Sequence, residues 1–409
     1  MAKKATAGLR GANWNTNRLP SSYRTSVASL YTDDGAITTG YLHACGGEDS
    51  VVCMMHPREL LTTHYLFPDV LNAGVAVWVQ GSRWVGNDLR LEHEFVLFDV
   101  AASMRHLRQL GFKRIFLMGV SGGGALYAFY NQQSLLDPAN RLASSPSGRP
   151  VNLAGAVMPP ADGFVLVSPH PGQGKLLQSC IDPSIEDEDR PLSIIRELDP
   201  FSEVNGFVPP PESSTYSKDF VSRYRTAQLE RVRRIDDYAR NLIKQKAAAR
   251  SKVKQGDKAA RALAAHSPIF TVWRTDADLR SWCTALDPSD RSVGSLWGSD
   301  PLTSNVGSVG FGRVCTPESW LSTWSGISSN ASFEKCGASI EQPTLFIQYT
   351  ADNAVFPSDA QTIFEGLSSP NKQRVMIKGN HHGLQVVDGD PNGQEVAGAA
   401  VSEWLKNKM

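Results

Sequence analysis

An apolar run that ends in a glycine-framed serine constrains the fold of this chain most. Residues 115–118 (IFLM) lead directly into Gly119-Val120-Ser121-Gly122-Gly123, and the helix-favouring run ALYAFYNQQ follows. A strand, a sharp turn and a helix in this order lift a serine hydroxyl above the end of a sheet, and the glycines permit close packing of the strand against the helix. The pattern predicts a nucleophilic Ser121, although a glycine-rich strand end can also be a plain turn.

Apolar runs that resemble strands alternate with stretches of helical spacing on both sides of this turn. We expect strands at 26–32, 37–45, 50–55, 75–81, 163–170, 343–352 and 373–382, and helices at 59–74, 91–111, 358–367 and 395–409. Such alternation is typical of an α/β protein with a mostly parallel sheet and helices on both faces. The alternation stops for about 170 residues, so we expect a core of residues 1–172 and 340–409 with an insertion at 173–339.

Two later loops carry the residue types that activate a serine. Its hydroxyl needs a base, and the base works best when a carboxylate orients it. Asp352 follows one predicted strand in TADNAVFP, and His381 and His382 follow the next in GNHHG. Chemistry in such sheets collects at the carboxyl ends of strands, and the expected order is serine, acid, histidine. The other candidate carboxylates lie further from a strand end: Asp359, Asp388 and Asp390.

Together these motifs resemble those of serine hydrolases with the α/β-hydrolase fold, and the resemblance covers the core but not the insertion. G-V-S-G-G is similar to the nucleophile elbow of that family, and T-A-D-N-A-V-F-P to its acid loop. In the family the histidine normally stands three residues after a glycine, so the resemblance implies a triad of Ser121, Asp352 and His382, counted from Gly379. His381 is then a neighbour that packs or binds substrate, or the alternative base.

The resemblance also implies an oxyanion hole made of two backbone N–H groups. The first donor is the amide of Gly122. The second comes from a loop that usually reads His-Gly-x, but this chain has His56-Pro57-Arg58. Proline has no N–H, so the second donor by position is the Arg58 amide. His56 and Trp84 are further candidates for substrate contact, whereas the Arg58 guanidinium is expected at a surface or in a structural role.

The resemblance places the insertion as a large, mainly helical cap over the carboxyl edge of the sheet. Residues 216–265 carry fourteen Lys/Arg against five Asp/Glu, and apolar residues recur at helical spacing: Leu229, Val232, Ile235, Ala239 and Leu242. This predicts a long, basic, amphipathic helix. Because no base-stacking aromatic residues are interleaved, we expect a solvated face or a homodimer contact rather than nucleic acid or lipid. Five of the nine tryptophans lie in 266–336, where they wall an apolar pocket or pack the cap onto the sheet.

The composition narrows the class of protein further. Lys+Arg and Asp+Glu are both 41, which gives no global reason to expect a nucleic-acid or membrane partner. No apolar run approaches the ~20 residues of a transmembrane helix, and the start lacks the apolar core of a signal peptide, so we expect a cytoplasmic protein. The six cysteines form no C-x-x-C pair and are expected as thiols, with a disulfide within 180–336 left open.

The sequence thus predicts hydrolysis of a small-molecule carboxylic ester, bulky or apolar, through an acyl-enzyme and with no metal or organic cofactor. The same triad also serves acyl transfer, thioester or amide hydrolysis and C–C bond hydrolysis. The alternative from another class is an interaction protein of the same fold that docks through the basic helix.

Overall fold

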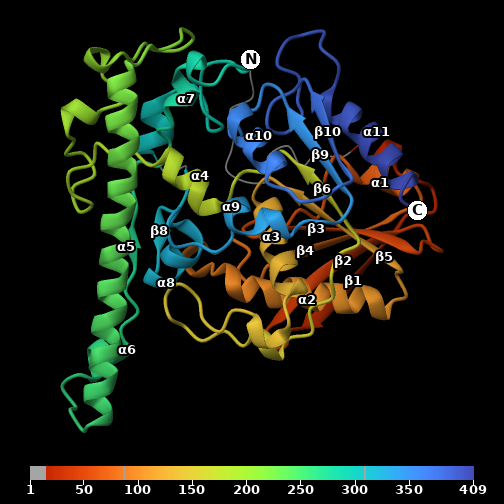
Figure 1. The fold of residues 1–409 in the computed structure, drawn as a ribbon, viewed down its shortest axis with the longest axis horizontal. Coiled ribbons are helices and arrows are strands. Elements are labelled where there is room, and N and C mark those ends of the chain that lie inside the picture. Colours follow the sequence, from red (N-terminus) through yellow and green to blue (C-terminus); the bar gives the residue numbers. More distant parts are fainter. Residues whose placement is uncertain (1–14, 87, 308–309) are drawn as a thin grey trace.

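A computed structural model describes residues 15–86, 88–307 and 310–409, and an eight-stranded sheet runs through its centre (Figure 1). The strand order is β1-β2-β4-β3-β5-β6-β9-β10. The strands are β1 (Arg24–Tyr31), β2 (Ile37–Ala44), β3 (Ser50–His56), β4 (Ala76–Gly81), β5 (Arg114–Val120), β6 (Gly163–Val167), β9 (Thr344–Tyr349) and β10 (Lys372–Ile377). β1 pairs antiparallel with β2 and β2 with β4, and the other neighbours are parallel. The predicted mostly parallel sheet is confirmed.

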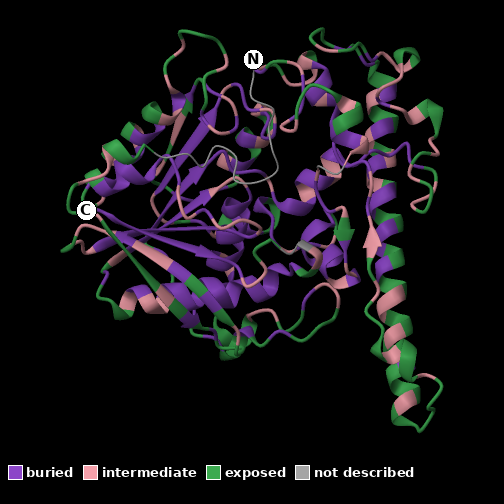
Figure 2. Cartoon of the chain, turned by 180° about the vertical axis from the view of Figure 1, so that it is seen from behind, coloured by how far each residue is buried: buried purple, intermediate pink, exposed green. Residues whose placement is uncertain are grey.

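Helices cover both faces of this sheet because its central strands are apolar on both sides. In β5, Ile115 and Leu117 face the cluster formed with α2 (His93–Gln109), α3 (Gly122–Leu135) and α10 (Pro357–Glu365). Phe116 and Met118 face the opposite cluster, formed with α1 (Phe67–Asn72) and α11 (Gly393–Lys406). This is the two-residue alternation of a strand, and both clusters are buried (Figure 2).

The helix predicted at 59–74 is wrong in its first half, since α1 begins only at Phe67. Pro68 lies in the first turn of α1, where its missing N–H needs no acceptor. A helix that extended far before Pro68 would bring the proline ring against the carbonyl four residues earlier. Residues 57–66 form a loop instead, beside the end of β3.

The segment between β6 and β9 includes residues 173–339, for which the sequence predicts a cap. Its elements are α4 (Gln173–Cys180), α5 (Lys218–Lys254), α6 (Arg261–Ala265), β7 (Phe270–Thr271), α7 (Leu279–Trp282), β8 (Val314–Cys315), α8 (Pro317–Ser319) and α9 (Phe333–Cys336), with π-helical turns at Leu302–Val306 and Trp320–Trp324. Long irregular stretches of this segment join these elements. Its last part joins the main core, where Ala331 and Phe333 belong to the same cluster as α3. The cap boundaries 173–339 stay a prediction.

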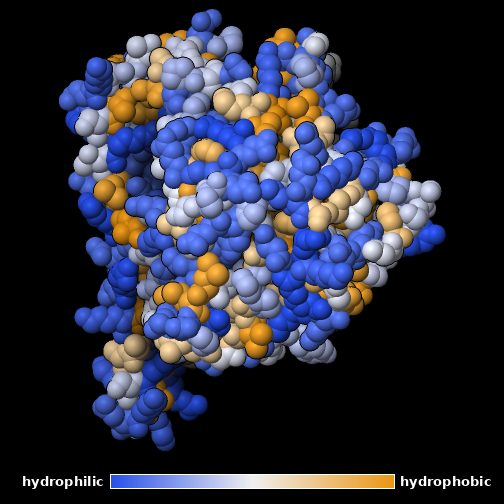
Figure 3. Space-filling view, turned by 45° about the vertical axis from the view of Figure 1, so that its right-hand side comes forward, coloured by the Kyte–Doolittle hydropathy of each residue, from blue (hydrophilic) through white to orange (hydrophobic). Residues whose placement is uncertain are grey.

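The predicted amphipathic helix is α5, which runs along one side of the molecule (Figure 1). Val232, Ile235 and Ala239 are buried in the interior of the insertion, whereas the C-terminal third is largely exposed. The end of α5 that projects past the rest of the molecule is mostly hydrophilic on the face shown in Figure 3. The helix ends at Lys254, and residues 261–265 form the separate helix α6.

Tryptophans and cysteines are mostly interior residues. Trp320 and Trp324 pack with α4 and α5, and Trp282 lies in a second cluster at the start of α5. All six cysteines are free thiols, so the disulfide left open within 180–336 is not formed. Among the described residues, no helix combines the length and apolarity needed to cross a membrane.

Candidate functional site

Ser121 is the single residue of a sharp turn between β5 and α3. Its backbone has φ 51° and ψ −118°, a conformation that costs energy for a residue with a side chain and that marks functional sites. The surrounding glycines are required by contact. A Cβ on Gly119 would lie 2.5 Å from Cα of Gly124, and one on Gly123 would lie 2.4 Å from the carbonyl oxygen of Met55. The motif therefore folds as the predicted elbow.

Asp352 and His381 form a hydrogen-bonded chain that reaches Ser121. The carboxylate follows β9 and accepts the N–H groups of Ala354 at 2.7 Å and Val355 at 2.9 Å. Nδ1 of His381 lies 2.8 Å from one carboxylate oxygen and 3.0 Å from the other, and its Nε2 lies 3.1 Å from Oγ of Ser121. Both Asp352 and His381 are buried. Because Nδ1 donates to the carboxylate, Nε2 is left to accept the serine proton.

The assignment of His382 to this place is wrong, and His381 occupies it. A tight turn separates the two side chains: Gly383 N–H donates to the Asn380 carbonyl at 2.8 Å, and His382 N–H donates to the Asn380 side chain at 3.0 Å. The two imidazole rings stand edge to face, with centroids 5.0 Å apart. His382 lies near His64, whose pKa is lowered to about 3 by burial and by the charge of His382. Counting from the glycine therefore selected the neighbour of the residue that meets the serine.

The two predicted oxyanion donors, the N–H groups of Gly122 and Arg58, differ in whether they already have an acceptor. Gly122 is the first residue of α3, so its N–H has no acceptor within the helix. The Arg58 N–H donates to Nδ1 of His56 in its own loop, at 3.3 Å. The Arg58 guanidinium lies over the rings of Trp324 at 5.0 Å and Phe311 at 5.6 Å, both in the insertion. The geometry gives the Arg58 amide no support as a donor.

Three polar side chains that converge on Gly122 are the main feature that the sequence analysis missed. A Cβ on Gly122 would lie 2.7 Å from Nε2 of Gln173, 2.9 Å from Nε2 of His170 and 3.0 Å from Nε2 of His56. His56 was expected near substrate, but His170 and Gln173 were not singled out. The signal for His170 was its place between two prolines at the end of a predicted strand. Nothing in the sequence pattern pointed to Gln173.

Trp84 does not join this group. Its ring packs edge-on against Phe95 at 6.1 Å and under the Arg83 guanidinium at 5.7 Å. These contacts hold the segment after β4 against the main core. The structure therefore places His56 beside Gly122, the residue after the serine, but gives Trp84 a packing role.

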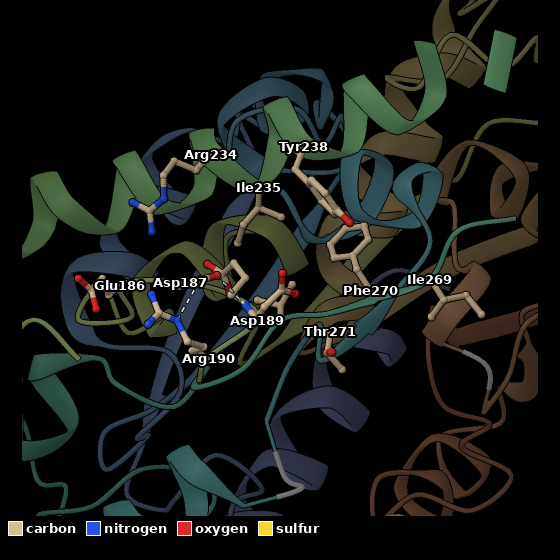
Figure 4. Close-up of a pocket in the computed structure, with 12 residues that line it drawn as sticks. Glu186, Asp187, Asp189, Arg190, Arg234, Ile235, Tyr238, Ile269, Phe270 and Thr271 are labelled. Carbon is tan, nitrogen blue, oxygen red and sulfur yellow. Dashed lines mark hydrogen bonds and ion pairs between the residues drawn. The ribbon is translucent and has the colours of Figure 1, made fainter. Parts of the chain in front are cut away.

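A cavity of about 590 Å³ lies elsewhere, in the insertion (Figure 4). Tyr238 of α5 and Phe270 of β7 stand on one side, edge to face at 5.5 Å, and the acidic run 186–189 stands across from them. Arg190 is paired with Asp187 at its rim. None of the residues that line this cavity belongs to the group around Ser121.

The comparisons with known proteins bear on the fold. No family model matches the chain, and no curated protein matches it. The α/β hydrolase GrgF from Penicillium sp. sh18 is 12% identical, with a TM-score of 0.50 over 94% of this chain and 99% of its own. The esterase Pf2001 of Pyrococcus furiosus is 13% identical, with a TM-score of 0.44 over 97% and 94%. A monoacylglycerol lipase of Paleococcus ferrophilus is 14% identical, with a TM-score of 0.40 over 94% and 100%.

The likeness to the first of these structures, together with the sheet order, shows that the protein has the α/β-hydrolase fold, as the sequence predicted.

Proposed function

We propose that the protein hydrolyses carboxylic esters through an acyl-enzyme on Ser121. The observation that carries this proposal is the unbroken chain of contacts from Asp352 through His381 to Ser121, at 2.8 and 3.1 Å. Such a chain activates a serine because the imidazole takes the hydroxyl proton as the oxygen attacks a carbonyl carbon.

The reaction follows from the positions of these groups. His381 Nε2 accepts the proton from Ser121 and returns it to the leaving alcohol, which leaves an ester between the acyl group and the serine. Water then gives a proton to the same nitrogen as it attacks this ester. The nitrogen passes that proton to Oγ of Ser121 as the Oγ–acyl bond breaks, and the acid departs with the serine restored. Asp352 keeps Nδ1 protonated and stabilises the imidazolium that forms in each step. The Gly122 N–H stabilises the negative oxygen of the tetrahedral intermediates.

The surroundings favour a bulky, apolar substrate. Phe311 and Trp324 of the insertion stand over the Arg58 guanidinium, two residues after His56. Both rings are buried among the other aromatic residues of the insertion, and this aromatic content is what supports an apolar substrate. The substrate class and the position of the insertion over the site are part of the proposal.

The test combines a covalent probe with a substrate panel. A fluorophosphonate should label the wild-type protein and the Ser251→Ala control, which changes an exposed serine of α5, but not Ser121→Ala. A panel of short and long esters, thioesters, amides and lactones should give Ser121-dependent turnover that is highest for bulky esters. Equal labelling of the wild type and Ser121→Ala would refute the proposal, and turnover of thioesters alone would change the substrate class.

A further inference from the structure

We infer that His170 and Gln173 donate side-chain hydrogen bonds to the oxyanion, in place of the second backbone donor that this fold usually takes from the loop after β3. The inference rests on the proposed function of Ser121. It starts from a gap: Pro57 has no N–H, and the Arg58 N–H is directed at His56. A serine hydrolase with one donor would lose much of its stabilisation of the tetrahedral intermediate.

The turn after β6 places both side chains beside the elbow. β6 is the neighbour of β5 in the sheet, so its carboxyl end lies next to Ser121. Ser168 turns the chain with φ 41°, and α4 begins at Gln173. Gly172 has φ 140°, and a Cβ there would lie 2.5 Å from the carbonyl oxygen of Ala331. Close packing thus holds the start of α4 against the site.

His170 offers a proton on the nitrogen that faces Gly122. Its Nδ1 accepts the Gly172 N–H at 3.2 Å, so the proton of the neutral ring is on Nε2. Burial, with the charges of His56 and His381, lowers the pKa of His170 well below its usual value, and the ring is neutral at pH 7. A neutral imidazole of this kind can polarise a carbonyl group by hydrogen bonding. His56 has the same tautomer, because its Nδ1 accepts the Arg58 N–H.

Gln173 adds a buried amide to the same space. Its residue is 2% exposed, and its Oε1 is buried without a hydrogen-bond partner. Burial of an unsatisfied amide oxygen costs about 1–3 kcal/mol. The amide Nε2, which lies 2.7 Å from the place of a Gly122 Cβ, is the part of this side chain that can donate to an anionic oxygen, and hydrogen bonds to charged groups are the strong ones.

The donors surround one point. Nε2 atoms of Gln173, His170 and His56 lie 2.7, 2.9 and 3.0 Å from the place of a Gly122 Cβ, and that place is two bonds from the Gly122 nitrogen. The Nε2–H groups of Gln173 and His170, at 2.7 and 2.9 Å from this place, together with the Gly122 N–H, fit an acceptor with negative charge. They also explain why residue 122 is a glycine, since any side chain would occupy this space.

The experiment measures the donors one at a time in the full chain. His170→Phe and Gln173→Leu should each lower kcat for the best ester about 100-fold, with KM within about threefold, because a lost oxyanion donor costs 10²–10³ in kcat. The rate constant for labelling of Ser121 by a fluorophosphonate should fall in parallel. The controls His266→Phe and Gln255→Leu, both exposed, should keep wild-type rates.

Gln173→Glu separates a donor from a structural residue, and it carries the test if His170→Phe does not fold. Glutamate has the size of glutamine but turns an N–H donor into a repelling carboxylate. We expect a loss of kcat at least as large as in Gln173→Leu, measured below the melting temperature of the variant so that only folded protein is compared. Wild-type kcat and labelling in Gln173→Glu would overturn the inference and leave the proposed function intact. Failure of the probe to label Ser121 in the wild type would overturn both.

Discussion

The sheet and the segment that interrupts it bury different kinds of side chain. β3, β5, β6 and β9 bury mainly apolar residues on both faces. The interior of the insertion combines tryptophans with buried charges: Asp182, Arg231, Arg274, Asp276 and Asp278. Apolar burial tolerates many partners, whereas a buried charge needs a specific one. The strands could therefore be located from their own composition, and the insertion depends on pairs that lie far apart in the sequence.

The two regions meet at the acid loop. Arg280 of α7 contacts Asp278 in the insertion at 2.8 Å and Asp359 in α10 at 3.0 Å. Its guanidinium also lies 4.1 Å from the centre of the Phe356 ring. The insertion thus braces the segment that follows Asp352. A substitution inside the insertion and a substitution at the Arg280 contact should therefore have different effects on ester turnover.

The largest effect on ester turnover is expected at the end of the sheet, from substitution of His381 rather than of its neighbour His382. His381→Ala should lower kcat for ester hydrolysis by about 10⁴–10⁶, the range found when a member of such a triad is removed. His382→Ala should stay within about tenfold of the wild type, because His382 does not face the serine. Both variants are measured with the same ester and checked by their melting temperatures. A larger loss of kcat in His382→Ala than in His381→Ala would show that His382 is the base.

These histidines also show where inference from sequence stops. The strands, the elbow and Asp352 follow from local patterns, because a strand alternates and a glycine turn has a steric cause. The choice between His381 and His382 depends on how Asn380 closes its turn through hydrogen bonds, which spacing does not reveal. His170 and Gln173 meet Gly122 only across neighbouring strands. Such contacts are tertiary and leave no periodic signal in the sequence.

The next largest effect is expected from two buried arginines, Arg280 at the contact between the two regions and Arg231 in the interior of the insertion. Arg231 is fully buried and bonds Glu188 and the carbonyls of Asp182 and Trp273, all within the insertion. Arg231→Met and Arg280→Met should each destabilise the protein by about 3 kcal/mol, the lower end of the cost of breaking a buried pair.

Only Arg280→Met should also lower kcat, by about tenfold, because only Arg280 holds the acid loop. Chemical denaturation gives the stability and ester turnover at low temperature gives kcat. Equal kcat values in the two variants would show that the insertion does not brace Asp352.

A pH-dependent effect of similar size is expected at Glu92, which precedes α2. Glu92 is 3% exposed, and burial raises its pKa to about 7 although Arg149 opposes the change. The ordinary pKa of a glutamate is 4.5. Between pH 4.5 and about 7 the folded protein therefore keeps a proton on Glu92 that the unfolded chain has already lost. Stability therefore falls as pH rises through this window.

Glu92→Gln removes this titration. Relative to the wild type, the variant should gain up to about 3 kcal/mol between pH 4 and pH 8, which corresponds to the difference between the two pKa values. Urea denaturation at both pH values measures the gain. A difference in stability that does not change with pH would contradict the raised pKa.

The smallest effect is expected at the far end of α5, where the insertion makes little contact with anything else. Lys244, Lys252 and Lys254 are exposed there. Exposed charges contribute little to stability, so changing all three to Gln should alter the free energy of unfolding by less than about 0.5 kcal/mol and leave ester turnover unchanged. Analytical ultracentrifugation of the same variant tests the expected alternative for this face. If α5 forms a homodimer contact through these lysines, the triple variant shifts the mass toward monomer; if the face is solvated, the mass stays that of the wild type. A loss of turnover in this variant would connect the basic helix to the reaction and break the separation between the two regions.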